Sequence, residues 1–158
     1  MDLKLIIYDF DGVMTDNRVL VFEDGKEAVF CNRSDGLAVE MIRKAGIKQF
    51  ILTSENNLVT SIRAFKLKIP LNISNNKKKT VEEICNSVNT SISNSVVFVG
   101  NDLNDLEAIK AVGFSFCPAD ACYEVKKVVD VVTISKGGEG VIREIYGILM
   151  EKKWLNKK

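Results

Sequence analysis

Short apolar runs alternate along the chain with segments whose apolar residues recur every three or four positions. The runs contain few polar residues, which is typical of parallel strands that are buried on both faces. They occupy residues 3–9, 50–53, 96–99, 113–116 and 131–134. Helical spacing is found in residues 34–46, 58–65, 80–88, 103–111, 120–128 and from 139 onward. This alternation predicts an α/β fold with a mostly parallel sheet and helices on both faces.

Two local signals refine this outline. Residues 19–22 and 28–30 flank the pair Asp24-Gly25, which predicts a β-hairpin over about residues 18–31. Ser34 is expected to cap the helix that follows the hairpin.

The composition fits one domain over residues 1–158, with a basic end, 152–158, that we expect to be mobile. The chain has no histidine, which excludes Ser-His-Asp catalysis, histidine zinc sites and an imidazole general base. Because 22 basic residues nearly balance 21 acidic ones, no nucleic-acid partner is expected. With no signal peptide, no apolar run of spanning length and no Cys-x-x-Cys pair, we expect a cytoplasmic protein without a membrane partner.

Polar side chains follow three of the predicted strands. Asp9 and Asp11 share one face at the end of the first, where two carboxylates repel each other unless a cation such as Mg²⁺ joins them. On spacing alone, two solvated loop aspartates beside a turn glycine are the alternative. The second strand ends in Thr53 and Ser54, whose hydroxyls can donate to an anion or cap a helix. The third leads into residues 100–105, a cluster of acidic and amide side chains. Ligands of open parallel sheets bind at the carboxyl ends of strands, so these residues are the first candidates for a site.

Three consecutive lysines, residues 77–79, precede the predicted helix at 80–88. One of them can neutralise a phosphate, although such a run also suits a solvated helix face.

In order along the chain, these elements are Asp-x-Asp-Gly-x-x-Thr, a strand-final Thr, a loop Lys and Gly-Asn-Asp-x-x-Asp. Their combination resembles the haloacid dehalogenase (HAD) superfamily of phosphohydrolases. The segments 34–36 and 137–144 are similar to its capless subfamily. That subfamily includes octulosonate 8-phosphate and nonulosonate 9-phosphate phosphatases, and a domain fused to some acylneuraminate cytidylyltransferases. The resemblance covers nearly the whole chain and implies a Rossmann-like HAD fold with a small hairpin flap and no cap domain.

The resemblance implies a role for each matching residue. Asp9 is expected to attack phosphorus and form an aspartyl-phosphate, and Asp11 to protonate the leaving oxygen and then activate water. Thr53 and Lys77 are expected to hold phosphoryl oxygens. Lys77 is preferred to Lys79 because its spacing to the following acidic pair matches relatives better.

Mg²⁺ is the cofactor that the resemblance implies, bound by Asp9, Asp11 and the loop after the third strand. Many relatives carry an aspartate where this chain has Asn101, whose amide oxygen can bind Mg²⁺ but adds no charge. Asn101 and Asp102 therefore both remain candidate ligands. Three further residues are expected beside or behind the phosphate, with one of them orienting the lysine or a metal-bound water: Gly12, Ser54 and Asp105.

The substrate implied by the resemblance is a small sugar phosphate, with an 8-carbon and a 9-carbon acid both open. Glu55, Arg63 and Lys66 resemble a pattern of nonulosonate 9-phosphate phosphatases, where such residues line the substrate site partly across a subunit interface. Arg33 is a weaker candidate, and ordinary solvated charges are the alternative for Arg63 and Lys66. The implied assembly is a homotetramer with sites at subunit interfaces.

Two other functions compete with catalysis. One is a non-catalytic oligomerisation domain like the one fused to the cytidylyltransferases, and the other is a receiver-type phospho-acceptor. The presence of Asp9, Asp11, Thr53 and Lys77 favours a phosphatase, because Asp11 supplies the general acid that a receiver lacks.

Overall fold

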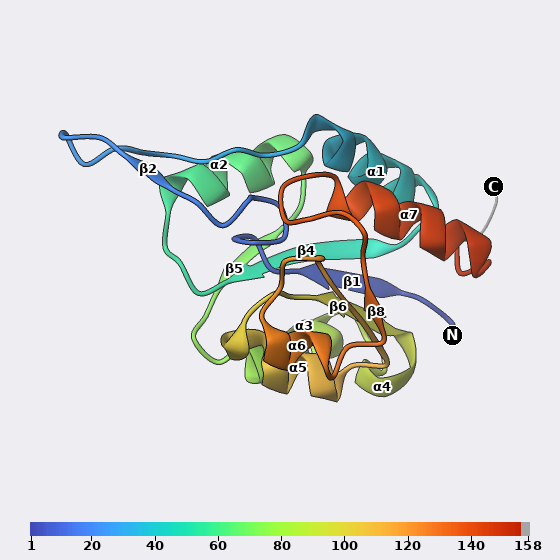
Figure 1. Cartoon of the computed structure of the whole chain (residues 1–158). Coiled ribbons are helices and arrows are strands. Elements are labelled where there is room, and N and C mark those ends of the chain that lie inside the picture. The colour runs from blue at the N-terminus through green and yellow to red at the C-terminus, as the bar shows by residue number, and fades with distance from the viewer. Residues whose placement is uncertain (156–158) are drawn as a thin grey trace.

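The structure is a computed structural model that describes residues 1–155 (Figure 1). Its centre is a sheet of six strands, all parallel, in the order β5-β4-β1-β6-β7-β8. The strands are β1 (Leu5–Tyr8), β4 (Lys48–Thr53), β5 (Leu71–Ile73), β6 (Val96–Val99), β7 (Phe114–Cys117) and β8 (Val131–Val132). This confirms the predicted α/β class, and no cap domain is inserted among the described residues.

Helices cover both faces of the sheet (Figure 1). One face carries α1 (Arg33–Lys44), α2 (Leu58–Leu67) and α7 (Val141–Glu151). The other carries α3 (Lys77–Ser87), α4 (Ile92–Ser95), α5 (Leu106–Ala111) and α6 (Tyr123–Lys126), with the 3-10 turn η1 (Leu103–Asp105). Strand β1 serves both cores because its side chains alternate: Ile6 and Tyr8 pack on the first side, Leu5 and Ile7 on the second. A strand buried on both faces explains the uninterrupted apolar run in the sequence.

The order of the strands reverses beside β1. The chain passes from β1 to β4 and β5 on one side, and then returns to β6, β7 and β8 on the other. The carboxyl ends of β1, β4 and β6 consequently meet at the switch point, where open parallel sheets bind their ligands.

Local boundaries differ from the prediction in several places. The cap of α1 is Asn32, whose side chain accepts a hydrogen bond from Ser34 N at 2.8 Å, so Ser34 lies in the first turn. The predicted helix at 120–128 is helical only over Tyr123–Lys126. The short elements β5 and α4 have no counterpart in the prediction.

The apolar residues that give segment 58–65 its helical spacing form one face of α2, and that face is exposed to solvent. Leu58, Ile62 and Phe65 are 73%, 59% and 87% exposed, whereas the helix packs through Ala64 and Leu67. Ala64 and Leu67 join the apolar core on this side of the sheet, where α2 contacts α1, and the three larger side chains remain on the outside.

Two appendages extend from this body. The hairpin consists of β2 (Leu20–Val21) and β3 (Glu27–Ala28), which pair antiparallel and project far from the sheet (Figure 1). The segment expected to be mobile, 152–158, is described as far as Leu155, which is buried, and Trp154 packs edge-on against Phe114. The rest of that segment lies outside the described residues.

Within residues 1–155, none of the helices has the length and apolar character needed to cross a bilayer.

Candidate active site

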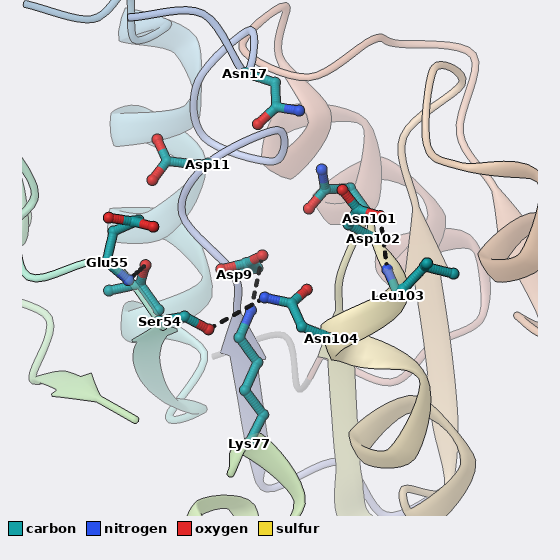
Figure 2. A pocket seen from close by; sticks show the side chains of 11 residues that line it. Asp9, Asp11, Asn17, Ser54, Glu55, Lys77, Asn101, Asp102, Leu103 and Asn104 are labelled. Carbon is teal, nitrogen blue, oxygen red and sulfur yellow. Dashed lines mark hydrogen bonds and ion pairs between the residues drawn. The ribbon is translucent and has the colours of Figure 1, made fainter. Parts of the chain in front are cut away.

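A pocket of about 410 Å³ opens at the carboxyl ends of β1, β4 and β6 (Figure 2). Eight of its residues were candidates from the sequence, namely Asp9, Asp11, Thr53, Ser54, Glu55, Lys77, Asn101 and Asp102. Asn104 belongs to the predicted polar cluster at 100–105 but was given no individual role, and Asn17 and Leu103 were not candidates. The parallel sheet thus brings together residues that are up to about ninety positions apart in the chain.

Lys77 forms a buried ion-pair network at the base of this pocket. Its Nζ lies 2.9 Å from Asp9 Oδ2 and 2.7 Å from Asp105 Oδ1, and the residue is only 2% exposed. Asn76 caps α3 by accepting from Lys79 N, which puts Lys77 on the inward side of the first turn. Lys79 points outward and pairs with the exposed Glu83, so Lys77 is the lysine that reaches the pocket.

Burial sets the protonation behaviour of this network. Burial and the charge of Asp105 raise the pKa of Asp9, Lys77 opposes both effects, and the net pKa is about 8. Burial also lowers the pKa of Lys77, but its two carboxylate partners outweigh this and hold the pKa above its ordinary value. The lysine is therefore a permanent cation at the base of the pocket.

Asp11 lies nearer the entrance, where a tight turn holds it. Thr15 Oγ1 donates to Asp11 Oδ1 at 3.2 Å and accepts from Gly12 N. Gly12 has φ +77°, and a Cβ at that position would lie 2.0 Å from the Asn101 side chain. Burial raises the pKa of Asp11, and the nearby Glu55 adds to this, while the Thr15 bond lowers it. A carboxyl group with a raised pKa keeps its proton more readily, as a general acid must.

The loop after β6 is organised by Asp105. Asp105 Oδ2 accepts hydrogen bonds from Asn101 N at 2.8 Å and from Asp102 N at 3.2 Å, so this carboxylate holds both the loop and Lys77. Asp102 Oδ1 accepts from Leu103 N at 2.7 Å and caps η1. The Asp102 carboxylate is thus engaged in local structure, although it lines the pocket.

Three oxygen atoms converge between these loops. The amide oxygen of Asn101 lies 2.9 Å from the carbonyl oxygen of Asp11 and 3.2 Å from Asp9 Oδ2, with no hydrogen between them. Adjacent ligands of octahedral Mg²⁺, at about 2.0–2.1 Å from the ion, lie about 2.9 Å apart. With the amide reversed, its nitrogen would donate to both oxygens, which is the arrangement expected without a cation. The donor set fits a hard cation, and Asn101 is better placed for it than Asp102.

No group of three carboxylate or thiol side chains converges as metal ligands within residues 1–155. A cation here would therefore be held by one carboxylate, one backbone carbonyl and one amide.

A family model described as haloacid dehalogenase-like hydrolase matches residues 35–145, more than half of the chain. The chain belongs to the haloacid dehalogenase-like hydrolases.

This HAD hydrolase is similar along nearly its full length to proteins named as octulosonate phosphatases or HAD hydrolases. It is 29% identical to 3-deoxy-D-manno-octulosonate 8-phosphate phosphatase KdsC of Haemophilus influenzae, over 95% of this chain and 84% of the relative. A solved structure assigned to the HAD hydrolase family, from Streptomyces avermitilis, has a TM-score of 0.91 and 37% identity, covering 97% of this chain and 88% of that one. The octulosonate phosphatase of Moraxella catarrhalis, solved with magnesium, phosphate and KDO, has a TM-score of 0.91 and 25% identity over 95% and 87%. Together they support a KdsC-like HAD enzyme of the phosphatase type.

Of the four candidates for substrate contacts in this HAD hydrolase, only Glu55 lines the pocket. Arg63 turns toward its own chain, where Nη2 donates to the carbonyl oxygen of Asn32 at 2.9 Å. Arg33 and Lys66 are exposed outside the pocket. Their roles in substrate binding stay predictions, and within one chain the pocket holds four carboxylates and a single lysine.

Sequence reasoning missed Asn17 of this HAD hydrolase and gave Asn104 no role beyond its place in the polar cluster at 100–105. Asn104 Nδ2 donates to Ser54 Oγ at 3.1 Å, which joins the loops after β6 and β4 (Figure 2). Asn17 has φ +63°, a left-handed conformation in which asparagine is enriched. A single asparagine in a loop belongs to no motif or periodic pattern. The one signal in the sequence that could have pointed to Asn17 is that it lies close to Asp11 along the chain.

Proposed function

We propose that this protein is a Mg²⁺-dependent phosphomonoesterase that removes phosphate from an 8- or 9-carbon sugar acid through an aspartyl-phosphate. The observation that carries the proposal is the meeting of Asp9 and Asp11 with Lys77 and Thr53 in one pocket. Similarity to octulosonate 8-phosphate phosphatases supports the class of substrate.

Two aspartates divide the chemistry. A carboxylate oxygen of Asp9 attacks phosphorus as the bond to the sugar oxygen breaks, and Asp11 gives its proton to that oxygen. Asp11, now a carboxylate, then takes a proton from the water that attacks the aspartyl-phosphate. Asp9 leaves as a carboxylate and inorganic phosphate is released. The raised pKa of Asp11 and its place nearer the entrance support this assignment.

The remaining pocket residues position the phosphoryl group. The Lys77 ammonium and the Thr53 and Ser54 hydroxyls are proposed to bind its oxygens, with Gly12 allowing the backbone to turn close to it. Asp105 holds Lys77 in place.

Asp9, the Asp11 carbonyl and Asn101 are the proposed ligands of Mg²⁺, with Asp102 as the less well placed candidate. Bound there, the ion would offset the repulsion between a carboxylate and a phosphate dianion.

Among the described residues that line the pocket, Lys77 is the single cation, and it already contacts two aspartates, so none of them is free for the carboxylate of a sugar acid. We therefore propose a homotetramer in which a neighbouring copy contributes Arg63, Lys66 or Arg33. The exposed apolar side chains of α2 and of the hairpin support such an assembly. The mass of the particle in sedimentation tests it, and a monomer that is active on sugar acids would overturn it.

The two competing functions are less well supported. A non-catalytic oligomerisation domain has no need for a paired lysine and two aspartates in one pocket, and a receiver has no need for Asp11.

All four cysteines are unpaired, which supports the expectation of a reducing compartment such as the cytoplasm.

The test is hydrolysis of a panel of phosphate esters with Mg²⁺. We expect turnover by the wild type, with octulosonate 8-phosphate or a nonulosonate 9-phosphate ranked first by kcat/KM. Asp9→Asn should abolish it, whereas Asp2→Asn, which changes an exposed aspartate outside the pocket, should leave it intact. A wild type that releases no phosphate from any ester would overturn the proposal.

A further inference from the structure

Asn17 lines the pocket but has no part in the proposed chemistry, and its side chain has no hydrogen-bond partner within residues 1–155. Asn17 lines the entrance opposite Lys77, between Asp11 and Asn101 (Figure 2). Within residues 1–155, its hydrogen bond is made by the backbone, from Asn17 N to Thr15 Oγ1 at 3.2 Å. Its side-chain amide faces the pocket with both donor and acceptor free.

The backbone at this position is one that glycine would adopt without strain. Asn17 has φ +63°, and a side chain in the left-handed region carries a conformational cost. The Thr15 hydroxyl that binds Asn17 N also donates to Asp11 Oδ1, so the backbone of Asn17 is tied to the proposed general acid. These hydrogen bonds use only the backbone of Asn17, so they do not explain why the residue carries a side-chain amide.

The position of Asn17 determines what it can touch. A leaving group whose oxygen meets Asp11 must extend away from Asp9 and Lys77, because both are buried at the base of the pocket. Asn17 lies on the side of the pocket away from Lys77, near Asp11 (Figure 2). An amide presents a donor and an acceptor side by side, which matches neighbouring hydroxyl groups of a polyol. The neighbouring lining carboxylates, Glu55 and Asp102, also suit hydroxyl donors rather than an anion.

We propose that Asn17 is a specificity-determining residue that binds hydroxyl groups of the leaving group through its side-chain amide. This rests on the proposed phosphatase function and adds a residue that discriminates between esters. In this proposal the amide does not contact the phosphoryl group, which binds at the base of the pocket. It therefore contributes to kcat/KM only when the leaving group carries hydroxyls.

The experiment compares two esters in Asn17→Gly, which removes the amide and accommodates the left-handed backbone. One ester is the better substrate among octulosonate 8-phosphate and a nonulosonate 9-phosphate, and the other is p-nitrophenyl phosphate. We expect kcat/KM for the sugar ester to fall about tenfold, the value of roughly one to two hydrogen bonds. The loss on the sugar ester should exceed the loss on p-nitrophenyl phosphate at least fivefold.

Two further variants complete the test. Asn89→Gly makes the same change at another left-handed asparagine, φ +52°, beyond the end of α3 and outside the pocket, and should alter neither ester. Asn17→Asp keeps the shape but loses the donor, and should lose at least as much activity on the sugar ester as Asn17→Gly.

Equal losses on the two esters, no loss on the sugar ester, or wild-type activity in Asn17→Asp would overturn the role of Asn17 while leaving the phosphatase intact. A wild type without turnover of any ester would remove the proposed function itself, and this inference with it.

Discussion

The base and the entrance of the pocket are built in different ways. The base comprises Asp9, Thr53, Lys77, Asn101 and Asp105, all buried, and its charged groups contact opposite charges. The entrance comprises Asn17, Glu55, Asp102 and Asn104, all exposed. The base can act in the same way on any phosphate ester, whereas the entrance meets the part of the substrate that differs between esters. Chemistry and selectivity are thus assigned to regions with different physical constraints.

The difference follows from the cost of burying charge. A buried ion that loses its partner is strongly destabilising, so each group of the base depends on the others and on the fold. Exposed charges at the entrance interact weakly with their neighbours and can change without much effect on stability. We expect substitutions at the base to alter both stability and activity, and substitutions at the entrance to alter activity toward particular substrates.

The largest effect is expected when Lys77 is removed. Lys77→Met leaves Asp9 and Asp105 buried without a cation, and should lower the free energy of unfolding by about 3 kcal/mol or more. Losing one preorganised donor should also lower kcat by about 10²–10³ for every ester. Urea unfolding and phosphate release measure the two effects. Lys79→Met is the matched control and should change stability by less than about 0.5 kcal/mol. A similar response from both lysines would contradict the role of Lys77 at the base of the pocket.

The next effect is expected at Asp11, which lies between the two regions. In Asp11→Asn, kcat/KM for a sugar phosphate should fall by about 10²–10⁴, because the alkoxide leaving group requires a proton. The loss on p-nitrophenyl phosphate should be much smaller, because nitrophenolate leaves without protonation. Since kcat/KM reports the first phosphoryl transfer, the later role of Asp11 with water does not enter the comparison. Equal losses on both esters would show that Asp11 is not the acid.

Much of the base could be predicted from the sequence, because its residues end long apolar runs. Asp9, Thr53 and the loop from Gly100 follow strands that are buried on both faces, and such strands are readily identified. Lys77 was less certain, since three lysines in a row differ only in which of them faces inward. Asn76 caps α3 and so fixes the residue at which the helix starts, which determines that Lys77 faces inward. The direction of that inward face depends in turn on how the helix packs on the rest of the fold.

The entrance and the outer helices were harder to predict. Strand β5 has only three residues, none of them fully buried, so its apolar pattern is weak. The exposed stripe on α2 has the spacing of a buried face, and periodicity does not tell which face a helix turns toward its own sheet. Asn17 belongs to no periodic pattern, and its place in the pocket follows from the turn after Asp11.

A smaller effect is expected on the affinity for Mg²⁺. Asn101→Ala removes one of three converging oxygens at the base, and should raise the Mg²⁺ concentration for half-maximal activity about tenfold, or about 1.4 kcal/mol. Asp102→Ala should raise it less, because its carboxylate caps η1. Titration of activity with Mg²⁺ measures both. A larger effect of Asp102→Ala than of Asn101→Ala would make Asp102, at the entrance, the metal ligand. If neither variant changed the Mg²⁺ dependence, this loop would not be part of the metal site.

The last prediction concerns the pH dependence of stability and involves Asp35, a buried carboxylate outside the pocket. It is only 2% exposed, makes no ion pair within residues 1–155, and caps α7 by accepting from Arg143 N at 2.9 Å. Burial raises its pKa from 3.8 to about 6. Because the folded state holds this proton more tightly than the unfolded chain, the contribution of Asp35 to stability is lost as pH rises through about 6.

Asp35→Asn keeps a side chain that can cap α7 but removes the ionisation. Compared with the wild type, its free energy of unfolding should lose about 1 kcal/mol less between pH 5 and pH 7, from about 1.36 kcal/mol per pKa unit. Urea unfolding at the two pH values, with chelator present, measures this difference. Asp9, whose pKa is also raised, titrates in both proteins and cancels in the comparison. An unchanged pH dependence would show that Asp35 does not titrate between pH 5 and pH 7 in the folded protein, and would contradict the raised pKa.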